Sequence, residues 1–101
     1  METVIHELRK AVHKGDFPKV LNWLFIRSHD VNANLYKDFD LFAVVNEQEN
    51  LFEMTVELSA FSVELTLQFG KHVSIYPIHA SELIYRKNQF SKNISTMSEI
   101  L

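Results

Sequence analysis

Two stretches of nearly unbroken apolar character dominate the middle of this 101-residue chain. "KVLNWLFIR" covers Lys19 to Arg27 and "FDLFAVVN" covers Phe39 to Asn46, and both are rich in β-branched and aromatic residues. Runs of this kind are typical of strands buried within a sheet. The polar segment between them, "SHDVNANLYKD", is rich in Asn and Asp and predicts a loop over Ser28 to Asp38.

Segments whose apolar residues have helical spacing lie before and after these two predicted strands. Residues 2 to 14 place their apolar side chains on one helical face, and Gly15 is expected to cap this helix before Pro18. A second helix is predicted from Leu51 to Ala60. The segment Phe61–Phe69 fits two templates. Its helical steps continue the second helix, whereas the alternation in "FSVELTLQF" is typical of a strand that turns at the following glycine.

The last thirty residues predict one more strand and one more helix. "HVSIYPIHA" is the expected strand, and Pro77 indicates a sheet edge or a strand end. Ser81 is the expected N-cap of a short helix over "SELIYRKNQF". The order predicts one domain over residues 1–101, of the α/β (α+β) class, in which a small mixed sheet of three to four strands packs with helices.

Composition narrows the class of protein. The chain has 47% hydrophobic residues, two glycines, two prolines and no cysteine, which fits one globular core and excludes disulfides and thiolate metal sites. Its net charge of -3 disfavours nucleic-acid binding through a basic surface. The N-terminal "METVIHELRK" is polar, and no apolar run approaches the roughly 20 residues of a membrane span. We therefore expect a cytoplasmic protein.

Two aspartates stand at the start of the second apolar run. Asp38 and Asp40 are two residues apart, so on a strand they share a face, while Phe39 between them turns into the core. Two carboxylates on one side form half of a Mg²⁺ site, because Mg²⁺ is bound by one or two carboxylates together with substrate phosphates. A polar strand edge would explain the same two residues, so the pair alone leaves both interpretations open.

The surroundings of the pair resemble a known family. A strand, a serine, a polar loop and "DFDLFAVV" follow one another, and Ser28 stands ten positions before Asp38. This order is similar to that of the minimal nucleotidyltransferases of the DNA polymerase beta superfamily, and "VELSAFSVELTLQFGKHVSIYPIHASEL" looks like the helix, glycine and strand that follow in an antitoxin branch of that family. The resemblance covers the chain from Val20 onward and favours a helix for Phe61–Phe69.

The resemblance implies a role for each matching residue. Asp38 and Asp40 would be the catalytic residues and would hold Mg²⁺ on the phosphates of a nucleoside triphosphate. Ser28 and the neighbouring backbone N–H groups would contact the terminal phosphates, and Arg27 is a further candidate for binding phosphate directly.

Several positions depart from the family pattern. Arg27 replaces the glycine before the serine, and His29 and Asp30 replace the Arg and Gly that are usual in the loop. Ser74 stands where many members carry a third carboxylate, which serves as general base or as a second metal ligand. These departures leave two functions open: a nucleotidyltransferase, or a degenerate antitoxin-like subunit that acts by complex formation.

The second function requires a surface for a partner. The predicted long helix carries Val56, Val63 and Leu67 on a second apolar face, in addition to the face that enters the core. Family members of this size pair with an all-helical partner protein in toxin–antitoxin modules. We therefore expect either such a helical partner or a homodimer. A third alternative is a small α+β protein in which Phe61–Phe69 is a strand and the resemblance is accidental.

Overall fold

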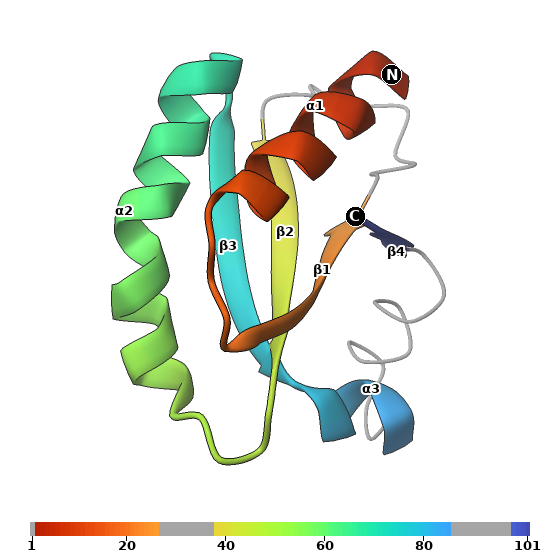
Figure 1. Ribbon diagram of the computed structural model, residues 1–101, viewed down its shortest axis with the longest axis vertical. Helices are drawn as coiled ribbons and strands as arrows, with labels where there is room; N and C mark the ends of the chain where they lie inside the picture. The colour runs from red at the N-terminus through yellow and green to blue at the C-terminus, as the bar shows by residue number, and fades with distance from the viewer. Residues whose placement is uncertain (1, 27–37, 86–97) are drawn as a thin grey trace.

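The chain forms a four-stranded mixed sheet packed with helices (Figure 1). The computed structural model describes residues 2–26, 38–85 and 98–101. The described elements follow one another as α1 (Glu2–Lys14), β1 (Val20–Ile26), β2 (Asp38–Val45), α2 (Leu51–Phe69), β3 (His72–His79), α3 (Ala80–Tyr85) and β4 (Ser98–Ile100). The predicted fold class is confirmed.

The strand order places β2 inside the sheet. The order is β3-β2-β1-β4, with β1 antiparallel to both β2 and β4, and β3 parallel to β2. Helix α2 connects the two parallel strands, as a parallel pair requires a crossover connection. β3 has a single partner in the sheet and is an edge strand, so the prediction from Pro77 is confirmed.

The two faces of the sheet are covered differently. One face, which we call the α1/α2 face, packs against these two helices through alternate residues of β2: Phe39, Leu41, Ala43 and Val45. The other face, which we call the α3 face, carries a smaller cluster in which Leu24, Phe42, Val44 and Ile78 pack with Ala80 and Leu83. β2 is therefore buried on both faces, as its apolar run predicts.

Helix α2 runs through the whole ambiguous segment. Its N-cap is Asn50, whose side chain accepts a hydrogen bond from the backbone N–H of Glu53 at 3.0 Å. It ends at Gly70, which has φ 67° and donates its N–H to the Thr66 carbonyl. Phe61–Phe69 is thus helical, as the resemblance favours. The strand alternative and the hairpin at Gly70 are wrong.

The end of α1 lies where the sequence predicts it. α1 ends at Lys14, and Gly15 follows as the cap, with its N–H donating to the Ala11 carbonyl at 3.1 Å, while the left-handed backbone comes one residue later, at Asp16, with φ 54°. Gly15 also serves a steric purpose. A Cβ at this position would lie 2.9 Å from the ring of Phe17 and 3.0 Å from the ring of Phe61. These two rings and Trp23 form an aromatic cluster, with the Phe17 and Phe61 centroids 4.8 Å apart. A side chain at Gly15 would displace it.

Two features near the C-terminus differ from the predicted ones. α3 begins at Ala80, so Ser81 lies inside the helix and is not its N-cap. The backbone N–H of Ser81 instead donates to the Glu47 carboxylate at 2.9 Å, so the cap comes from the turn after β2. Ser98–Ile100 adds the fourth strand, which no pattern in the tail predicts. The predicted helical residues 86–90 lie outside the described residues.

Side chains of α2 close part of the exposed edge of β3. The Val73 N–H donates to the Thr66 hydroxyl at 3.0 Å, and the Val73 carbonyl accepts from the Ser62 hydroxyl. Pro77 lies four residues later, at the equivalent alternate position, and has no N–H to expose. Unpaired edge groups invite pairing with other chains. The hydroxyl groups of α2 and the missing N–H of Pro77 therefore both protect this edge.

We predict that Thr66→Val, which keeps the shape of the side chain, lowers the free energy of unfolding by about 1–3 kcal/mol, because the half-buried Val73 N–H loses its acceptor. Thr55→Val is the matched control, since the exposed Thr55 hydroxyl donates to the Leu51 carbonyl of its own helix. Urea unfolding followed by circular dichroism measures both. Equal losses in the two variants would show that the β3 edge does not depend on Thr66.

We also predict that Gly15→Ala destabilises the fold. Replacing glycine by alanine at a compatible backbone position stabilises by about 0.4–1 kcal/mol through the unfolded state. Here the two nearby rings oppose that gain, because overpacking typically costs about 1–3 kcal/mol. In a Phe17→Leu background, a double-mutant cycle in urea should show a smaller cost for Gly15→Ala. An unchanged cost in that background would contradict the steric explanation.

Candidate functional site

The candidate site lies where β2 begins. Phe39 enters the core on the α1/α2 face, as predicted, and Asp40 is half-buried on the α3 face. Asp38 is the first residue of β2, and its backbone pairs with that of His72. Only the backbone of Asp38 is described, so the expectation that both carboxylates project together stays a prediction. A pair two residues apart on one strand has the spacing that this requires.

The neighbours of Asp40 come from two strands. In the sheet register, Asp40 lies opposite Ser74 of β3 and opposite Ile26, the last residue of β1. The structure therefore places Ser74, the position of the expected third carboxylate, directly beside Asp40. That position holds a hydroxyl group. The interpretation of Ser74 as a lost carboxylate stays a prediction, because only a relative could show it.

The donor set fits Mg²⁺ only in part. Two aspartates together with substrate phosphates are a ligand set that Mg²⁺ accepts. Among the described residues, no three His, Cys, Asp or Glu side chains lie together as a metal site. A metal at this position would be held by the aspartates together with phosphate oxygens of the substrate.

Other predicted site residues lie beyond the end of β1. Arg27, Ser28, His29 and Asp30 belong to the segment 27–37, which is not among the described residues. Their phosphate contacts therefore stay predictions. β1 ends at Ile26, whose backbone pairs with that of Asp40, so the chain leaves β1 beside the carboxylate.

An aromatic pair follows Asp40 on the same face. Phe42 is 4% exposed, and its ring centroid lies 5.4 Å from that of Tyr76, with the planes at 31°. Tyr76 is 46% exposed. Neither residue was predicted from the sequence to belong to a site. The sequence places Phe42 two residues after Asp40 and hence on the same face of a strand. The position of Tyr76 beside Phe42 follows from the pairing of β2 with β3.

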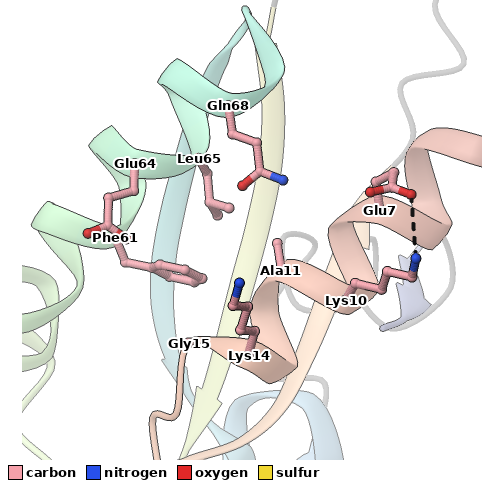
Figure 2. A pocket seen from close by; sticks show the side chains of 9 residues that line it. All are labelled: Glu7, Lys10, Ala11, Lys14, Gly15, Phe61, Glu64, Leu65 and Gln68. Atoms are coloured by element: carbon pink, nitrogen blue, oxygen red, sulfur yellow. Dashed lines mark ion pairs between the residues drawn. The ribbon is translucent and has the colours of Figure 1, made fainter.

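A hollow lies between α1 and α2, on the side of the sheet opposite to Asp40 (Figure 2). It has a volume of about 550 Å³ and is lined by Glu7, Lys10, Ala11, Lys14, Gly15, Phe61, Glu64, Leu65 and Gln68. The Lys10 ammonium lies 3.9 Å from the Glu7 carboxylate. Charges of both signs line this hollow.

The outer face of α2 is apolar along its length. Four large side chains are more than half exposed: Phe52 at 76%, Val56 at 59%, Val63 at 58% and Leu67 at 79%. Their spacing places them on one stripe, opposite the buried Met54, Leu58, Phe61 and Leu65. The period-two alternation noted in the sequence thus arises from one helix with two apolar faces.

Comparison with protein-family models, with curated proteins and with solved structures finds no match to this chain. The resemblance to the minimal nucleotidyltransferases therefore rests on the residues quoted above and stays a prediction. Within the described part of the chain, no helix has the length and apolar character needed to cross a membrane.

Proposed function

We propose that this chain is a minimal nucleotidyltransferase-fold protein that transfers a nucleoside monophosphate from a Mg²⁺-bound nucleoside triphosphate to a hydroxyl group on a protein or nucleic acid. One observation carries the proposal. "DFD" begins an inner strand, with Asp40 beside the end of β1 and the start of β3. A cytoplasmic location belongs to the same proposal, since a chain without cysteine needs no oxidising compartment.

Asp38 and Asp40 would hold the metal, which when bound neutralises phosphate charge and aligns the transferred group. Ser28, Arg27 and nearby backbone N–H groups would bind the terminal phosphates. In the transfer, a bond forms between the acceptor oxygen and the α-phosphorus. The bond from that phosphorus to the oxygen shared with the β-phosphate breaks, and pyrophosphate leaves.

The departing proton of the acceptor hydroxyl has no carboxylate at Ser74 to receive it. A serine hydroxyl is a poor proton acceptor at neutral pH, so in this mechanism the proton passes to water. General-base catalysis typically contributes about 10²- to 10⁴-fold to a rate. We therefore expect a slow transferase, in which positioning and charge neutralisation supply most of the rate enhancement.

The first test is thermal unfolding with and without Mg²⁺-ATP. A ligand at about a hundred times its Kd stabilises the folded state by about 2.7 kcal/mol, which raises the Tm of a domain of this size by about 10–20 °C. Asp38→Asn combined with Asp40→Asn should abolish this shift and any transfer of radiolabelled nucleotide. Phe52→Ala, which changes an exposed side chain of α2, is the control and should keep the shift.

Two results would contradict the proposal. One is the absence of any shift in the unmodified chain at millimolar Mg²⁺-ATP. The other is a full shift in the doubly substituted variant, which would remove these two aspartates from the site.

A second function is favoured by the apolar stripe on α2. A non-catalytic or antitoxin-like subunit would act by complex formation, and exposed apolar patches of this kind mark contact sites. One flank of the stripe is acidic, with Glu53, Glu57 and Glu64. Glu57 lies 3.8 Å from the Lys19 ammonium, and α2 itself contains no basic residue. Two copies of α2 packed antiparallel would bring these flanks together. A helical partner with lysines beside its apolar face therefore fits better than a homodimer.

Two model helical peptides with the same apolar stripe test this function. One peptide carries Lys on the flanks of the stripe, and the other carries Glu at the same positions. Fluorescence anisotropy should show binding of the Lys peptide alone, weaker at higher salt. Val56→Lys with Val63→Lys should remove this binding, and Lys14→Ala on α1 should not. Equal binding of both peptides, or a stable dimer of the chain by sedimentation equilibrium, would contradict the partner proposed.

A further inference from the structure

The α3 face of the β2–β3 pair carries polar and aromatic residues in successive rows. Asp40 pairs with Ser74, and one row further along the strands Phe42 pairs with Tyr76. Residues two apart on a strand share a face and are separated by about 7 Å. The carboxylate of the candidate site and the exposed ring of Tyr76 therefore belong to one continuous strip of the sheet.

Tyr76 has the properties of a stacking surface. Its ring rests against Phe42, which is almost fully buried, so the tyrosine has a fixed support beneath it. At 46% exposure, much of its side chain remains open to solvent. Large exposed aromatic side chains with a packed partner lose little conformational entropy on binding a flat ligand, because packing already restricts their rotamers.

A hollow beside this ring has the chemical character of a ligand pocket. It has a volume of about 350 Å³ and is lined by Phe42, Leu51, Tyr76, Pro77, Ile78 and Glu82, of which only Glu82 is charged. Small-molecule sites are typically clefts of about 300–1,000 Å³ with mostly apolar walls and few polar groups. Phe42, which lines this hollow, follows Asp40 on the same face of β2. The hollow therefore shares Phe42 and Tyr76 with the row that follows Asp40 and Ser74 along the two strands.

We propose that the Phe42–Tyr76 row is a platform on which the base of the nucleotide stacks while its phosphates lie at Asp40. This inference rests on the proposed nucleotidyltransferase function and adds a subsite to it. In a nucleotide, the ribose separates the base from the phosphates, and the one-row step between Asp40 and Phe42 provides a matching separation. The order of polar and aromatic rows also fixes the direction in which the nucleotide would lie.

The platform also defines the class of substrate. Stacking on an aromatic ring tolerates any base, because every base presents a π face. The site is therefore expected to accept nucleoside triphosphates with little discrimination among bases. It should still distinguish them from inorganic tripolyphosphate, which has the phosphates without a base.

Calorimetric titration with Mg²⁺-ATP and with Mg²⁺-tripolyphosphate tests the platform. Base–aromatic stacking corresponds to about 5- to 150-fold in affinity. The unmodified chain should bind ATP more tightly than tripolyphosphate by a factor in this range. Tyr76→Ala should lower ATP affinity to the level of tripolyphosphate and leave tripolyphosphate binding unchanged. Tyr76→Phe and Tyr76→Trp should keep the preference for ATP.

Two control variants separate the subsite from the rest of the chain. Phe52→Ala removes an exposed aromatic side chain of α2 and should keep the preference for ATP. Asp40→Asn should weaken both ligands to a similar extent. Circular dichroism melting of each variant verifies that the fold persists, as expected for the exposed Tyr76.

The measured affinities separate a failure of the stacking platform from a failure of the nucleotidyltransferase function on which it rests. If the unmodified chain binds both ligands equally, or if Tyr76→Ala binds ATP as tightly as the unmodified chain, the platform is overturned and the nucleotidyltransferase proposal stands. If the unmodified chain binds neither ligand at millimolar concentration, both proposals are overturned.

Discussion

The burial of β2 on both faces is the constraint on which the rest of the structure depends. Leu41, Ala43 and Val45 pack under α1 and α2, while Phe42 and Val44 pack on the opposite face. A strand in this position accepts polar residues only near its ends, where solvent or ligand can reach them. The aspartates occur at the first and third positions of β2. The exclusion of polar residues from the middle of β2 and the location of the candidate site at its start therefore follow from the same packing.

Helix α2 combines three surfaces with different tasks. One face supplies Met54, Leu58, Phe61 and Leu65 to the core, where each buried side chain contributes about 1.5–3 kcal/mol. Ser62 and Thr66, on one flank of α2, form hydrogen bonds with the backbone of the edge strand β3. The outer stripe remains exposed. α2 also joins β2 to β3, whose parallel register brings Ser74 and Tyr76 beside Asp40 and Phe42.

Much of the fold follows from periodicity, and the exceptions have identifiable physical causes. α1 and the strands β1 to β3 lie close to their predicted bounds because their apolar patterns are strong, whereas the pattern left Phe61–Phe69 of α2 open between helix and strand. The prediction for Ser81 was wrong because a cap can come from a distant residue, here Glu47. The cap at Gly15 was predicted, but its need for space was not, because the rings of Phe17 and Phe61 approach it only in the folded chain. Of the candidate site, the aspartates were predictable from spacing, and Tyr76 was not.

The sequence by itself determined the positions of α1, the strands β1 to β3 and the first half of α2, that β2 is buried, and that two aspartates stand at its start. These properties are local, because side-chain periodicity relative to a helix or a strand depends only on neighbours along the chain. The tertiary structure alone decided that Ser74 and Tyr76 lie beside Asp40 and Phe42, and that the second apolar face of α2 is exposed. Those properties depend on strand order and on which surfaces find a partner in packing. Neither the strand order nor the choice of packing partners is encoded in any single segment.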